Sequence, residues 1–260
     1  GPRLVDDDMT IIVLGAILIG VCLGLLGSGG SILTVPILVY MLGHPEKAAM
    51  GESLAIVGLI AAAGVIQKCR KGEINWQAVM WFGVPAMIGT FGGAQLARVV
   101  PASVQMTVLG ILMLLAAFLM IRRKEDPEQG DGSSRRLRTF LLLEGVFVGA
   151  VTGLVGIGGG FLIVPALVLG TGLRMHAVIG TSLAIIMLKS ITGFAGYLMV
   201  LDSVQQRIDW WTILLFAVLG TVGSLTAGSI ATRIDQLLLK RMFAVILLLL
   251  GLAVVVSEVL

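Results

Sequence analysis

The sequence predicts an all-α membrane protein with several membrane-crossing helices, built from two repeats of inverted topology. The mean hydropathy is +1.04, and only 13% of the residues are charged, against roughly 25% in soluble domains. Apolar runs of about 18–25 residues recur along the chain, and each is long enough to cross a hydrocarbon core of about 30 Å. The third observation is an internal repeat, which relates the two halves of the chain.

The repeat is clearest in two glycine-rich stretches that end in proline. GLLGSGGSILTVP (24–36) returns as GLVGIGGGFLIVP (153–165), 129 positions later. In the same register, MGESLAI (50–56) falls on IGTSLAI (179–185), and after a five-residue insertion INW (74–76) falls on IDW (208–210). A repeat that keeps its register over this length indicates a duplicated unit. We therefore divide the chain into a tail or tag remnant (1–8), a first membrane repeat (9–121), a cytoplasmic linker (122–138) and a second membrane repeat (139–260).

Each half contains about five apolar segments. Those of the first half cover about 9–26, 30–43, 48–67, 76–97 and 102–121. Those of the second half cover about 139–156, 159–172, 177–200, 209–231 and 237–257. The second segment of each half is short, because residues 31–42 form only about 18 Å of helix. We expect it to be re-entrant or broken, so that eight to ten membrane helices result.

The distribution of basic residues predicts how the halves are oriented. Five is an odd number, so the second half should be inverted relative to the first. With the N-terminus outside, 13 Lys and Arg residues fall inside and 4 outside, as the positive-inside rule requires. Merging the first two segments into one span gives parallel halves and a weaker bias of 11 against 6. We therefore expect a multi-pass membrane protein with both termini outside the cytoplasm.

The two glycine stretches interrupt apolar runs at equivalent places in the two halves. Interrupted helices of inverted repeats commonly meet near the midplane of transporters, where their N-termini offer unpaired N–H groups to a substrate. The alternative is that the glycines only allow close helix crossing, which we expect for the pairs Gly20/Gly24, Gly149/Gly153, Gly89/Gly93 and Gly220/Ser224. The predicted substrate-lining residues are Gly27, Ser28, Gly29, Gly30, Ser31, Gly156, Gly158, Gly159 and Gly160.

Lys189 is the most informative single residue. It lies in the middle of the segment 177–200, where a charged side chain costs about 2.5–3.5 kcal/mol. Its counterpart in the first repeat is Ile60, so the repeat itself does not require a lysine. It is expected to counter the charge of an anionic substrate, to carry a proton, or to form a structural ion pair with Glu144 or Glu52.

Several other polar residues are open to two interpretations. Glu52 and Glu144 are either carboxylates near helix starts, favoured by the helix dipole, or proton-coupling groups. Ser53 and Ser182 are either substrate-binding hydroxyls or helix-packing donors. His44 and His176, at segment ends, are expected to be solvated loop residues.

The two motifs GSGGSILTVP and GIGGGFLIVP, with the GTSLA run that follows, resemble the sulfite exporter family of the TauE/SafE type. The resemblance covers nearly the whole chain, although Ser31 replaces the third glycine and Glu52 stands where the second half has Thr181. It implies an inner-membrane permease for small sulfur-containing or carboxylate anions, such as sulfite, thiosulfate or an organosulfonate.

The sequence thus favours a secondary transporter that alternates access around a midplane anion site, coupled to protons, to sodium or to the gradient of the anion itself. An anion channel lined by the same glycines is the alternative. We expect no enzyme, because no histidine accompanies a serine within the membrane segments. No cofactor, metal or nucleic acid is expected, and the expected partners are the anion and the lipid bilayer. The oligomeric state stays open.

Overall fold

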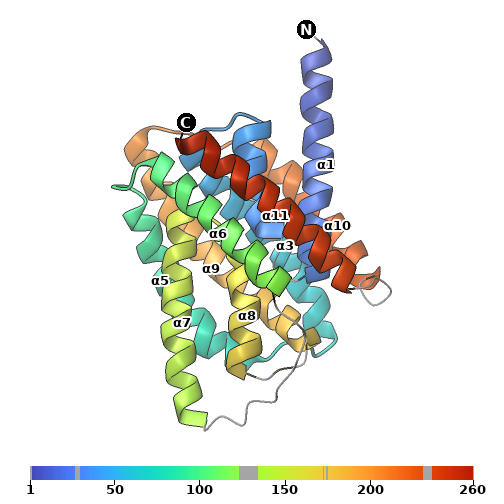
Figure 1. Cartoon of the computed structure of the whole chain (residues 1–260), viewed down its shortest axis with the longest axis vertical. Coiled ribbons are helices and arrows are strands. Elements are labelled where there is room, and N and C mark those ends of the chain that lie inside the picture. Colours follow the sequence, from blue (N-terminus) through green and yellow to red (C-terminus); the bar gives the residue numbers. More distant parts are fainter. Residues whose placement is uncertain are drawn as a thin grey trace.

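The computed structural model describes residues 2–26, 30–122, 134–171, 173, 175–230 and 236–259. These residues form helices and short connections, without a strand among them (Figure 1). The first half contains α1 (Pro2–Leu26), α2 (Gly30–Pro36), the π-helical η1 (Ile37–Met41), α3 (Glu46–Arg70), α4 (Trp76–Ala78), the π-helical η2 (Val79–Gly83), α5 (Val84–Leu96) and α6 (Ala102–Arg122). The second half contains α7 (Ser134–Val155), α8 (Gly160–Thr171), α9 (Met175–Val204), α10 (Trp210–Ile230) and α11 (Gln236–Val259).

The helices follow the predicted apolar segments closely. The largest differences are at the starts of α1 and α7, which begin several residues early, at Pro2 and Ser134. The polar residues at these starts can be helical, because a helix can continue beyond the membrane. The apolar pattern shows which residues lie in the membrane and does not show where backbone hydrogen bonding ends. The first turns of α1 extend past the rest of the bundle (Figure 1). Most of the expected linker 122–138 lies outside the described residues.

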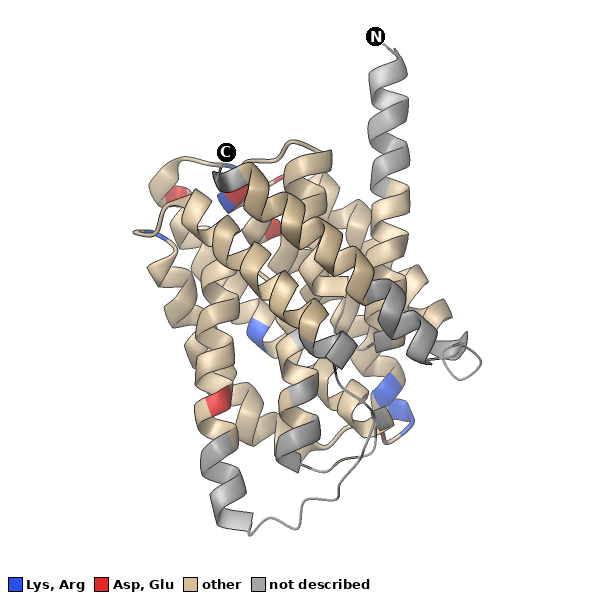
Figure 2. Ribbon diagram, in the orientation of Figure 1, with Lys and Arg blue, Asp and Glu red and all other residues tan. Residues whose placement is uncertain are grey.

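The described helices suit a membrane environment. Three of them, spanning Glu46–Arg70, His176–Val204 and Trp210–Ala227, are long and apolar enough to cross a bilayer by length and composition. Other described helices are apolar but shorter, and α8 has only 12 residues, or about 18 Å. The described charged residues gather mainly near the two ends of the bundle (Figure 2).

Small residues bring two pairs of helices into backbone contact. A Cβ added at Gly20 or Gly24 of α1 would overlap the carbonyls of Gly220 and Ser224 on α10. In the same way, Gly149 and Gly153 of α7 lie against the backbones of Ala86 and Thr90 on α5. Gly89 and Gly93 of α5 also face the α7 backbone. The predicted packing role of these small-residue pairs is therefore confirmed.

Helices α3 and α9 cross in antiparallel directions at the centre of the bundle. The contacts run in opposite order along the two helices: Gly51 with Tyr197, Gly58 with Ser190, and Gly64 with Leu183. Helices α6 and α11 are also antiparallel, and Gly110 lies against Gly251 and Val255. The start of α3 therefore lies near the end of α9, and the end of α3 lies near the start of α9.

The α5–α7 contact gives a prediction with a neighbouring control. Gly93→Ala places a methyl group against the Ala150 carbonyl, whereas a Cβ at Gly92 meets nothing within 4 Å. We expect Gly93→Ala to lower stability by about 1–3 kcal/mol through overpacking. Gly92→Ala should leave the stability unchanged or slightly raised, because alanine favours helix. The measurement is thermal unfolding in detergent, and equal losses in the two variants would contradict the packing account.

Candidate anion site and a second polar cluster

The second glycine stretch forms a buried loop between α7 and α8. Helix α7 ends at Val155, and the amide of Ile157 donates to the Thr152 carbonyl, which closes the last turn. Gly156 and Gly159 have φ values of +69° and +64°, a region that side chains disfavour. The predicted helix break is therefore present at Gly156–Gly159, and Gly160 begins α8. Within the described chain, no backbone carbonyl accepts from the amides of Gly158 and Gly159.

Helix α3 and the start of α2 cover this loop. Gly156 lies against Met50 and Gly158 against Val57. Ser53 shares their face of α3 by helical spacing, and its buried hydroxyl has no hydrogen-bond partner among the described residues. The Cβ of Ser31, in the first turn of α2, also lies beside Gly158. The structure thus brings the described parts of the two glycine stretches together.

The remaining predicted residues of the first stretch are only partly placed. Gly30 and Ser31 are buried at the start of α2, and Gly30 lies against the α1 backbone at Ile19. Gly27, Ser28 and Gly29 lie outside the described residues.

Lys189 is fully buried, with 0% of its surface exposed. Its Nζ donates to Thr152 Oγ1 at 2.6 Å, and that hydroxyl donates in turn to the Val148 and Gly149 carbonyls of α7. The Nζ also contacts Gly159, where an added Cβ would overlap it. A buried amino group next to a loop whose amides have no described backbone acceptor is an arrangement that suits an anion.

No described carboxylate pairs with Lys189, so the two expected partners are engaged elsewhere or distant. Glu52 pairs with His44. Glu144 lies two turns before Thr152 on α7, about 12 Å along the axis, and one of its buried oxygens has no described partner. Ser182 is also remote: it lies about 10 Å along α9 from Lys189, and its hydroxyl donates to the Ile179 carbonyl at 2.9 Å.

Sequence reasoning missed Thr152, the hydroxyl that accepts from Lys189 at this site. It also missed Ser190, a buried hydroxyl without a described partner that lies against Gly58 at the α3–α9 crossing. Thr152 lies four residues before the first glycine of the loop, the spacing of one helical turn, which is the signal that could have found it.

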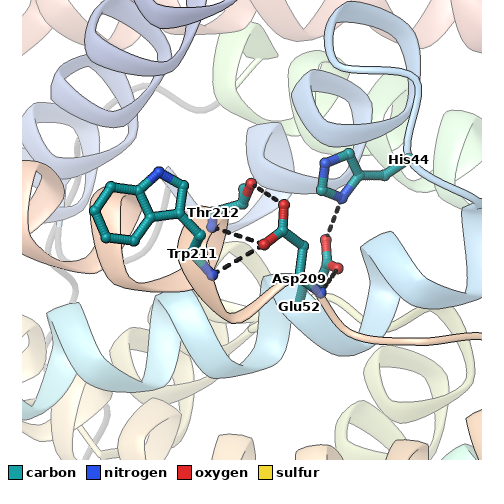
Figure 3. A network of polar contacts seen from close by, with 5 residues as sticks. All are labelled: His44, Glu52, Asp209, Trp211 and Thr212. Atoms are coloured by element: carbon teal, nitrogen blue, oxygen red, sulfur yellow. Dashed lines mark hydrogen bonds and ion pairs between the residues drawn. The ribbon is translucent and has the colours of Figure 1, made fainter.

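A second polar cluster joins the first residues of α3 to the connection before α10 (Figure 3). Glu52 Oε2 lies 2.6 Å from His44 Nδ1, and its Oε1 accepts from the Asp209 amide at 2.9 Å. Asp209 in turn caps α10, accepting from the Trp211 and Thr212 amides and the Thr212 hydroxyl. The expectation that His44 is a solvated loop residue was wrong, because the loop folds back over α3 and places its ring on Glu52; His176 is exposed.

These contacts move the pKa values of the loop groups. The hydrogen bond with Glu52 raises the pKa of His44 above 6.5, against an opposing effect of burial. Burial acts to raise the pKa of Asp209, but hydrogen bonds from Thr212 and Trp211 outweigh it, so that this pKa is lowered.

An equivalent contact at the other end of α3 carries no titratable pair. The Asn75 amide donates to Thr181 Oγ1 at 3.0 Å, and the Asn75 side chain caps the next helix by accepting from Ala78. In the repeat alignment, Thr181 corresponds to Glu52 and Asn75 to Asp209. Nearby, Lys68 donates to Glu73 at 2.6 Å and thereby lowers the pKa of Glu73.

The helical bundle and its apolar spans are those of a multi-pass membrane protein. The chain belongs to the sulfite exporter TauE/SafE family, whose model matches residues 12–254. A probable membrane transporter protein of Xylella fastidiosa is 32% identical over 237 residues, covering 89% of this chain and 88% of the relative. The probable membrane transporter protein YdhB of Bacillus subtilis is 27% identical over 233 residues, with 88% and 91% covered. These names indicate a membrane transporter and not an enzyme, and no solved structure matches the chain significantly.

The His44–Glu52 pair predicts a pH-dependent stability. Because the folded pKa of His44 is raised, protonation stabilises the fold fully below its ordinary value of 6.5, and this contribution is lost as pH rises through the raised pKa. We expect the Tm of the wild type to fall over that range. His44→Asn should remove this part of the pH profile, whereas His176→Asn, at an exposed position, should retain it. A His44→Asn profile with the slope of the wild type would contradict the pairing.

Proposed function

We propose that the protein is a secondary transporter for a small sulfur-containing anion such as sulfite, thiosulfate or an organosulfonate. The observation that carries the proposal is Lys189, which is fully buried, pairs with no described carboxylate and lies against the glycine loop. Leaving a charge without a counter-charge at this depth is costly, and a bound anion supplies the missing charge. The sulfur chemistry rests on the family to which the chain belongs.

The proposed site combines three kinds of donor. Lys189 supplies a positive charge, the amides of Gly158 and Gly159 supply N–H groups, and the N-terminus of α8 supplies the positive end of a helix dipole. Ser53 adds a buried hydroxyl from α3. Ser31, whose Cβ lies beside Gly158, completes the lining by proposal together with Gly156 and Gly160. Gly27, Ser28 and Gly29 lie outside the described residues. Ser182 is left out, because its hydroxyl is used within its own helix and lies about two turns from Lys189.

Inverted repeats support alternating access around this site. The repeat relates α3 to α9 and α6 to α11, and the helices of each of these pairs run antiparallel where they meet. It also relates the α1–α10 contact to the α7–α5 contact. Rocking of one repeat against the other would expose Lys189 to either side in turn. The burial of Lys189 in the described conformation favours a transporter over a continuously open channel. We place both termini in the periplasm on the basis of the charge distribution.

The test compares Lys189→Met and Lys189→Arg with the wild type. Purified protein is heated with sulfite, thiosulfate, sulfoacetate, sulfate, taurine, acetate or oxalate at matched ionic strength. At a hundred times its Kd, a ligand should stabilise the wild type by about 2.7 kcal/mol. We expect Lys189→Met to abolish this shift and the uptake into proteoliposomes, and Lys189→Arg to retain part of both.

Lys71→Met, in the exposed connection after α3, removes a positive charge remote from the site and is the control. It should keep the ligand-induced shift of the wild type. Lys189→Met with the anion affinity and uptake of the wild type would refute the proposed role of Lys189.

A further inference from the structure

The His44–Glu52 cluster has a chemistry that the anion site does not use. Glu52 is 1% exposed, and both of its carboxylate oxygens are engaged, one by the His44 ring and one by the Asp209 amide. The three residues come from three separate places in the chain: the loop before α3, α3 itself and the connection before α10 (Figure 3). An imidazole paired with a buried carboxylate can take up and release a proton near neutral pH.

The contact at the other end of α3 indicates that the backbone link itself does not require a titratable pair. There the Asn75 amide is accepted by the neutral hydroxyl of Thr181, in the position that the repeat assigns to Glu52. The counterpart of His44 is Leu173. The same backbone amide is therefore bound once by a titratable pair and once by a neutral hydroxyl. Holding the connection to the helix explains the hydrogen bond, but it does not explain why a carboxylate and an imidazole are present.

We propose that the coupling ion is a proton and that it binds at the His44–Glu52 pair. The inference rests on the proposed transport function. On binding, one proton from solution converts the imidazole–carboxylate pair to an imidazolium–carboxylate pair, and the cluster gains one positive charge. On release, the proton returns to solution and the pair regains its negative charge.

Helix α3 connects this pair to the anion site. Ser53 follows Glu52 directly, and Met50 and Val57 contact the glycine loop, all within about 8 Å along the helix axis. A positive charge gained here favours an anion at Lys189, and by linkage the bound anion favours the proton. The link from the Asp209 amide to Glu52 makes the same pair a contact between the two repeats, so a change in its charge also acts on the connection between α9 and α10.

The other charged and titratable groups around the pair come from each neighbouring element. Asp209 faces His44 from the connection before α10 and favours its protonated form. Glu46 and Lys47 lie in the first turn of α3, while Asp202 and Arg207 are exposed at the end of α9 and in the connection that follows. Tyr197 of α9 is buried, and its hydroxyl donates to the Leu154 carbonyl at 2.8 Å.

The experiment uses proteoliposomes and radiolabelled sulfite, thiosulfate or sulfoacetate, whichever stabilises the purified wild type. Two readouts are measured: counterflow exchange without a pH difference, and accumulation driven by an imposed difference of one pH unit in either direction. With one proton coupled to one anion, one pH unit supports an accumulation of about tenfold. We expect His44→Asn and Glu52→Gln both to lose this accumulation while they keep counterflow. The first removes the imidazole that takes up the proton, and the second removes the carboxylate that holds the proton there.

Thr181→Val is the matched control, because it removes the equivalent hydrogen bond without removing a titratable group. It should keep the accumulation driven by pH, even if its overall rate changes. Glu52→Gln with tenfold accumulation would overturn the inference, and accumulation driven by a sodium gradient and indifferent to pH would do the same. A wild type without counterflow of any of the three anions would instead refute the proposed transport function, and the proton site with it.

Discussion

The burial of the Lys189 amino group against the glycine loop is the constraint on which the rest of the site depends. The amine occupies the space of a Cβ at Gly159, and Gly159 and Gly156 need positive φ values, so these glycines satisfy steric and conformational demands together. Thr152 both accepts from Lys189 and closes the end of α7. Helix α3 then seals the loop through Met50 and Val57. The lysine, the helix break and the packing of α3 are thus one arrangement, and a bound anion would complete its charge balance.

The two repeats share backbone contacts and differ in side-chain chemistry. Small residues in α1 and α7 meet α10 and α5 in equivalent ways, and an amide before a helix start is accepted at both ends of α3. The differences are Lys189 in place of Ile60, and the His44–Glu52 pair in place of Leu173 and Thr181. One repeat thus carries the buried positive charge and the other the titratable pair. In the proposed transporter, the contacts that the two repeats share support their movement. The residues that differ between the repeats bind the anion and the proton.

Much of the fold could be predicted from the sequence, because the length of each apolar segment and the internal repeat can be read directly from the chain. The bounds of α3, α6 and α10, the helix break at Gly156–Gly159 and the packing role of Gly153 all followed from such patterns. The partners of the polar residues could not be predicted in this way. His44 is brought to Glu52 by the fold of a short loop, and Asp209 reaches Glu52 from 157 positions away. Periodicity places Thr152 one turn before the glycine loop, but it does not identify Lys189, on another helix, as the group that donates to its hydroxyl.

The most direct test of the account is an experimental structure of the protein with the sulfur anion that stabilises it. The account predicts density for the anion within about 3 Å of Lys189 Nζ, bounded by the amides of Gly158 and Gly159. Density for the anion at another place, with the Lys189 side chain still enclosed against Thr152 and Gly159, would contradict it.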